Sequence, residues 1–128
     1  MANSSLGIKW IKMAALYLLV GIGMGIHMGK SHDFSLMPVH AHANLLGWAT
    51  MGLMGLLHHV FAKQLVNKIA VVQFWIHQVA TPILLIALAL MLKGNSDIEP
   101  VVGIMSMVVG VSILLFVYNV FRNLKAAE

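Results

Sequence analysis

The sequence contains no cysteine and very few charged residues. Only 9% of its 128 residues are charged, whereas a soluble domain has roughly 25%. The missing thiols exclude disulfides, iron–sulfur clusters, thiolate-bound haem and zinc–thiolate sites. The low charge also excludes a disordered chain and a nucleic-acid-binding module, because both classes need charge that this chain lacks.

Apolar residues dominate what is present. Hydrophobic residues make up 60% of the chain, and its mean hydropathy is +0.90. A membrane-spanning helix needs ~20 mostly apolar residues. Four segments meet this requirement: about residues 10–29, 38–61, 70–92 and 101–121. The linkers between them are short, which makes consecutive helices antiparallel neighbours. We therefore expect an all-α membrane protein in which residues 1–128 form a single domain, a bundle of four transmembrane helices.

The distribution of basic residues predicts the orientation of this bundle. Lysine and arginine are enriched in the cytoplasmic loops of membrane proteins. Only Lys30 and Lys93 fall at one end of the predicted bundle. The other six basic residues fall at the opposite end: Lys9, Lys12, Lys63, Lys68, Arg122 and Lys125. This asymmetry places both termini in the cytoplasm, in a bacterial inner membrane.

The seven histidines fall into two layers of the predicted bundle. Ionisable residues inside membrane spans are costly and are candidates for function. The outer layer contains His27, His32, His40 and His42. The inner layer contains His58, His59 and His77. At a rise of ~1.5 Å per residue, the two layers are ~24 Å apart, so one metal ion cannot bind both.

The outer layer favours a cofactor. His40 and His42 are two residues apart, so their side chains project ~160° from each other on a regular helix. They cannot share one small metal ion, but they can ligate two haems on opposite flanks of the helix. His27 lies at the same depth and is a third candidate axial ligand. The alternative is a purely structural role, in which these histidines form hydrogen bonds within the bundle or to interfacial water.

The inner layer gives a weaker signal. His58 and His59 end the second span beside Lys63, where side chains reach the headgroups, so we expect this pair to be solvated. His77 lies deeper, and we expect it to bond a neighbouring helix. A second metal site formed by these three histidines is the alternative.

Two further hypotheses use the outer residues differently. A copper site could combine His27, His32 and Asp33 with Met28 or Met37, because thioether and imidazole ligands suit Cu(I). Alternatively, the chain is a structural subunit of a larger respiratory complex and has no cofactor of its own.

A resemblance to a known family lies in residues 32–42, which follow the pattern His-Asp, six residues, His-x-His. This pattern resembles the tenth transmembrane helix of haem–copper oxidase subunit I, and the spacing matches throughout. The resemblance implies that His40 and His42 are axial haem ligands, with His32 and Asp33 beside the haem propionates.

The resemblance extends more weakly over roughly residues 20–120. Residues 74–77 are similar to the start of the family's eleventh helix, and residues 38–48 are similar to short four-helix proteins related to cytochrome oxidase subunit I. The whole chain thus resembles one arc of four helices, the ninth to the twelfth.

The chain also departs from the family. The sequence has no His-x3-Tyr, which the family's copper site uses, and His58-His59 lies at the wrong end of the His-x-His helix. The family's subunit has twelve spans in three arcs of four, whereas the four spans expected here correspond to a single arc. We therefore expect a closed homo-oligomer, most simply a trimer, in which neighbouring copies share haem.

The expected function is that of a membrane cytochrome with haem b. Two histidines per iron imply electron transfer with a redox partner, whereas one histidine and an open position imply binding or reduction of a small gas such as O₂ or NO. The sequence does not choose between these, and an oxidoreductase activity stays open. A complete proton-pumping oxidase is not expected from this chain alone.

Overall fold

The computed structural model describes residues 5–127, which form helices and connecting loops without any strand. Its elements are α1 (Ser5–Ser31), α2 (Met37–His42), the π-helical segment η1 (Ala43–Ala49), α3 (Thr50–Val60), α4 (Ala62–Leu65), α5 (Lys68–Leu92), the 3-10 turn η2 (Ser96–Ile98) and α6 (Glu99–Asn123). Three helices in this part of the chain are long and apolar enough to cross a membrane: α1, α5 and the run Ser96–Asn123 that includes α6.

The second expected span is a run of three helical segments rather than one regular helix. α2, η1 and α3 follow one another without a gap, and the residues at both junctions, Ala43 and Thr50, have right-handed helical backbone angles. The amide of Thr50 donates to the carbonyl of Leu45, five residues back, which is the wider π turn. Such π segments are rare in proteins, and those that occur are often found at functional sites.

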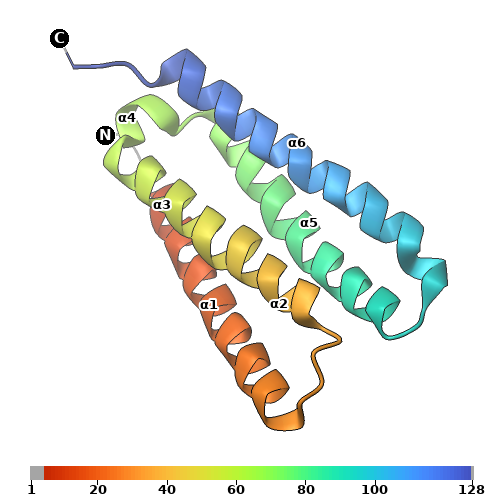
Figure 1. The fold of residues 1–128 in the computed structure, drawn as a ribbon. Coiled ribbons are helices and arrows are strands. Elements are labelled where there is room, and N and C mark those ends of the chain that lie inside the picture. The colour runs from red at the N-terminus through yellow and green to blue at the C-terminus, as the bar shows by residue number, and fades with distance from the viewer. Residues whose placement is uncertain (1–4, 128) are drawn as a thin grey trace.

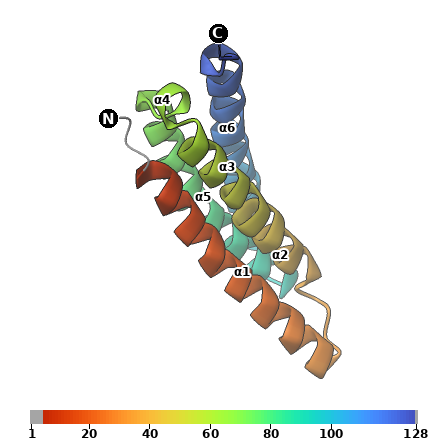
Figure 2. The same cartoon turned by 90° about the vertical axis from the view of Figure 1, so that its left-hand side faces the viewer.

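The helices form two closely packed pairs, α1 with η1 and α3, and α5 with α6 (Figures 1 and 2). Glycine makes the first pair tight. A Cβ added to Gly7 would lie 2.7 Å from the carbonyl oxygen of Gly55, and one added to Gly47 would lie 2.4 Å from the Tyr17 ring. Small residues at such contacts let membrane helices approach closely.

The core joins the two pairs. Its largest cluster surrounds the fully buried Trp10 of α1 and includes Met51 and Met54 of α3 with Phe74 of α5. A second cluster joins Val39 and Ala43 to the C-terminal half of α5. Because Leu6 and Trp10 are buried here, α1 begins several residues before the expected residue 10.

Local sequence explains the helix ends. α1 ends at Ser31 because His32 adopts a left-handed conformation with φ 54°, a common helix stop. Asn67 caps α5 by accepting a hydrogen bond from the amide of Ala70. At the other end of α5, Gly94 has φ 109°, and the amide of Asn95 bonds the carbonyl of Leu90. This is the Schellman pattern that glycine favours.

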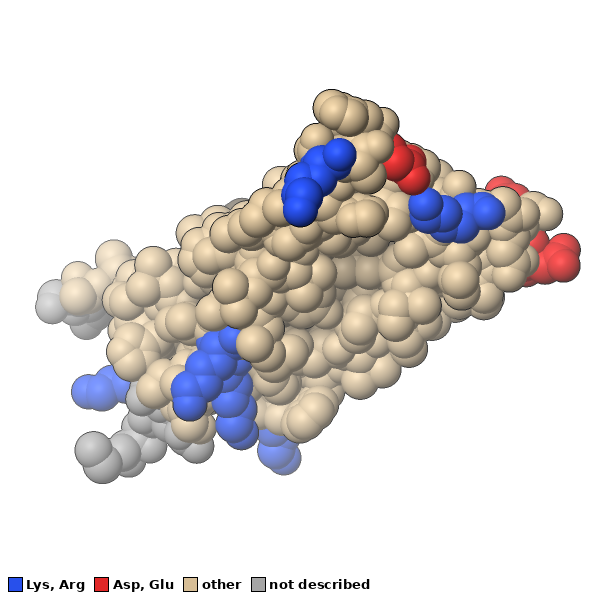
Figure 3. Space-filling view, turned by 90° about the horizontal axis from the view of Figure 1, so that it is seen from below, with Lys and Arg blue, Asp and Glu red and all other residues tan. Residues whose placement is uncertain are grey.

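Charged side chains gather at the two ends of the elongated molecule, and a broad uncharged band lies between them (Figure 3). Along this band, large apolar side chains such as Leu19, Leu53 and Leu114 are more than 60% exposed. Both ends of the described chain lie at the end of the molecule that contains α4 (Figure 1). A surface with this division suits a lipid bilayer rather than water.

Candidate functional site

α2 holds the two central histidines in different surroundings. His42 is exposed, whereas His40 is half-buried and lies against α1, where a Cβ added to Gly25 would be 3.2 Å from the His40 ring. α2 is regular up to His42, because the π segment begins only at Ala43. The two rings therefore lie on different flanks of α2, in keeping with the divergence that their spacing predicts.

The backbone fixes the tautomer of His42. Its Nδ1 lies 2.6 Å from the carbonyl oxygen of Pro38, and because a carbonyl only accepts, Nδ1 carries the proton. Pro38 begins α2, so its carbonyl is one turn before His42. In the neutral ring, Nε2 is then the nitrogen with the free lone pair, and the ring is exposed. Histidines that ligate metals almost always donate their other ring N–H in this way.

Asn44, in the first turn of η1, supports His40. Its side-chain Nδ2 donates to the carbonyl oxygen of His40 at 2.9 Å and lies 3.5 Å from Nδ1 of the same residue. Gly21 of α1 leaves the space for this amide, since an added Cβ would lie 2.4 Å from Asn44 Oδ1. Asn44 thus links the π segment, α1 and the His40 ring.

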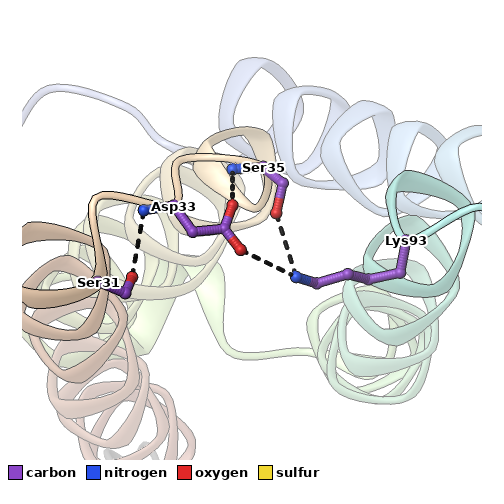
Figure 4. A network of polar contacts seen from close by, with 4 residues as sticks. All are labelled: Ser31, Asp33, Ser35 and Lys93. Atoms are coloured by element: carbon purple, nitrogen blue, oxygen red, sulfur yellow. Dashed lines mark hydrogen bonds and ion pairs between the residues drawn. The ribbon is translucent and has the colours of Figure 1, made fainter.

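Asp33 lies in a polar network that joins two loops (Figure 4). Its carboxylate accepts the amide N–H of Ser35 at 3.0 Å and pairs with Lys93 Nζ at 3.4 Å. Lys93 also donates to the hydroxyl of Ser35 at 3.2 Å, and the amide of Asp33 donates to the hydroxyl of Ser31 at 3.2 Å. The end of α5 is thereby tied to the loop between α1 and α2.

This network stabilises the charged form of Asp33. The pKa of the Asp33 carboxyl is lowered to about 2. The largest cause is the hydrogen bond from the Ser35 amide, followed by that from the Ser35 side chain and then by the ammonium group of Lys93. Asp33 is therefore an anion at any physiological pH.

His27 lies beside this network, but His32 does not join a site with it. His27 lines a small cavity with Met28, Asp33 and Lys93, and its volume of about 30 Å³ suits a water molecule rather than a haem. His32 is exposed at the end of α1. Among residues 5–127, no three histidine, aspartate or glutamate side chains lie together as a metal site would require.

The inner histidines are arranged differently from one another. His58 is fully buried, and its ring stacks on Trp10 with 6.4 Å between centroids. His77 is also fully buried, with its ring 5.3 Å from Trp10, whereas His59 is exposed. The three therefore do not converge on one point.

The expectation that His58 is solvated is wrong. α3 packs against α1 through Gly7 and Gly55, and this approach turns His58 into the bundle, where its Nδ1 bonds the carbonyl of Met54 at 2.6 Å. His59, the next residue, faces outward as expected.

His77 bonds a neighbouring helix, as predicted. Its Nδ1 lies 2.8 Å from the hydroxyl of Ser112 on α6. Its Nε2 lies 3.1 Å from the carbonyl oxygen of Leu46 in η1. His77 thus connects α6 to the π segment that follows His42.

Sequence reasoning missed Asn44, Lys93 and Trp10 as parts of these sites. Asn44 could have been found, because it lies four residues after His40 on the same helical face. The pairing of Lys93 with Asp33 joins residues 60 positions apart and leaves no local signal.

Comparison with family models, curated proteins and solved structures finds no match to this chain.

Proposed function

We propose that this chain is a four-span protein of a bacterial inner membrane that binds haem b near the outer face through His40 and His42. Both termini lie in the cytoplasm in this proposal. It rests on the resemblance of residues 32–42 to haem–copper oxidase subunit I and on the placement of the two rings. The observation that supports it most is the orientation of His42.

The donor set suits haem. The His42 ring is exposed, and its Nδ1 bonds the Pro38 carbonyl, so Nε2 is the nitrogen available to an iron. His40 has a different environment against Gly25, so the two residues can serve two separate irons. Haem iron takes one or two imidazoles, so the lack of a three-residue metal cluster among residues 5–127 does not conflict with it.

The outer loops supply partners of both charges. Lys93 and the hydroxyl of Ser35 are donors at the surface that can bind carboxylates such as haem propionates. Asp33 holds Lys93 in place through its ion pair. The chain's own part is thus to orient imidazoles, provide an apolar surround and position donors.

Haem supplies one-electron chemistry and, where its iron keeps an open position, a site for a small gas such as O₂ or NO. The cavity beside His27 is too small for haem, and His42 faces outward. We therefore propose that haem lies between copies of the chain in a closed homo-oligomer, with the trimer as the simplest form.

Replacement of His42 tests this proposal. We expect His42→Gly to lose most of its bound haem, measured as haem extracted per chain, and added imidazole to restore it. His59→Gly is the matched control, because His59 is an exposed histidine at the other end of the bundle. Full haem occupancy in His42→Gly, or equal loss in both variants, would contradict the assignment.

A further inference from the structure

We propose that the groove between α1 and α5 at the lysine-rich end of the bundle binds the headgroup of an anionic phospholipid. The groove has a volume of about 380 Å³, within the range of roughly 300–1,000 Å³ that small-molecule sites occupy. It is lined by Lys9, Lys12, Met13, Phe74, Trp75 and Gln78. This inference depends on the chain lying in a membrane, but not on haem.

The α1 side of the groove has two parts. Lys12 and Met13 lie three and four residues after Lys9, so both neighbour it on one side of the helix. Both lysines are exposed, whereas Met13 packs against the core. The face therefore offers two ammonium groups at its rim and an apolar surface deeper in the bundle.

The α5 side is aromatic and apolar. Phe74 is buried and contacts the Trp10 ring edge-on, with 4.9 Å between centroids, which closes the groove toward the core. The neighbouring residue Trp75 is 60% exposed and also lines the groove. Tryptophan is enriched at the level of the headgroups in membrane proteins.

Charge complementarity identifies the occupant. A groove with two cations at its mouth and apolar walls below matches a molecule with an anionic head and a hydrocarbon tail. Basic pockets between transmembrane helices bind anionic lipids in this way. Among residues 5–127, no carboxylate lines the groove to neutralise Lys9 and Lys12. An anionic phospholipid has both an anionic head and a hydrocarbon tail, and the surrounding bilayer supplies it continuously.

The test is a titration of the detergent-purified full chain with short-chain phosphatidylglycerol, followed by native mass spectrometry and thermal unfolding. We expect saturable binding that phosphatidylcholine does not reproduce. Lys9→Gln/Lys12→Gln should weaken it about 30-fold, since each lysine near an anionic headgroup contributes about 1 kcal/mol. Inorganic phosphate should not compete, because it lacks the apolar tail.

Matched variants make the result decisive. Lys63→Gln/Lys68→Gln removes the same charge from the same end of the molecule but outside the groove, and it should bind like the unmodified chain. Trp75→Ala should weaken binding of lipid tails, whereas Trp48→Ala, at another exposed tryptophan, should not. Equal weakening by both lysine pairs, or no preference of the unmodified chain for phosphatidylglycerol, would overturn the proposal.

Discussion

At the residue scale, hydrogen bonds to the backbone decide what the polar side chains can do. His42 and His58 both have Nδ1 2.6 Å from the carbonyl four residues earlier, so each has Nε2 as its remaining nitrogen. The His58 ring is buried in the core and its Nε2 has no hydrogen-bond partner, whereas the His42 ring is exposed. The same local bond thus accompanies a buried ring in one helix and an accessible ring nitrogen in the other.

Asp33 permits a prediction about pH. Because its pKa is lowered, its contribution to stability is complete above the ordinary carboxyl pKa of about 3.9 and is lost as the pH falls toward about 2. In Lys93→Gln we expect the pKa of Asp33 to rise but to stay below the ordinary value, since the Ser35 amide is the larger cause. Titration of the labelled carboxyl by NMR measures this.

Lys30→Gln is the control for this titration. Lys30 is also an exposed lysine, in the last turn of α1, but it does not pair with Asp33. An Asp33 pKa that is unchanged in Lys93→Gln, or raised equally in both variants, would contradict the geometry of the loop network.

At the element scale, the contact between α1 and the helix formed by α2, η1 and α3 positions the outer histidines. Gly25 faces His40, Gly21 faces Asn44 and Gly47 faces Tyr17. Gly21 and Gly25 are four residues apart and both lie at this close contact. A Cβ at Gly29 would meet nothing within 4 Å, so the close contact does not extend to the end of α1.

Gly55→Ala tests this contact. The added Cβ would lie 2.8 Å from side-chain atoms of Trp10 and Ile11 and 2.9 Å from the Gly7 carbonyl oxygen, so a helix must shift. We expect the free energy of unfolding to fall by about 1–3 kcal/mol, the usual cost of overpacking. Gly110→Ala on α6 adds the same atom in open space and should be neutral or slightly stabilising. Equal effects of the two substitutions, measured by unfolding in detergent, would show that the contact is looser than described.

The elements also show how far sequence reasoning extends. Runs of apolar residues predicted the helices within a few residues, because hydrophobic length is what a membrane selects. The π segment could not be predicted from the sequence. A π turn contains one more residue than an α turn, but both are formed by the same kinds of apolar residues. The burial of His58 depends on which face of α3 meets α1, and that follows from glycine contacts between residues 48 positions apart, Gly7 and Gly55.

Some residues of the candidate site were proposed from the sequence, but its connections were not. The spacing of His40 and His42 anticipated their different surroundings, because α2 is a regular helix there. Two links required the fold: Lys93 at the end of α5 with Asp33 in the loop after α1, and His77 of α5 with Leu46 of η1. Both join residues more than 30 positions apart, so no local pattern predicts them.

At the scale of the whole molecule, its outer surface matters most. Large apolar side chains are exposed along every long helix, and the His42 ring is also exposed. A haem held at such a surface needs a second wall to exclude water and lipid. A further copy of the chain provides that wall in the proposed oligomer, as closed symmetry allows.

The most direct test of the central claim is one chromatographic measurement on the chain purified from cells supplied with haem. Light scattering gives the mass of the eluted species while its visible spectrum is recorded, oxidised and then reduced with dithionite, with and without CO. We predict a Soret band that elutes with a multiple of the 14.0 kDa chain, three for a trimer. Insensitivity to CO would indicate two histidines per iron, and a CO shift would indicate an open position. Absence of the Soret band would contradict the account, and a monomer with full haem would contradict its shared site.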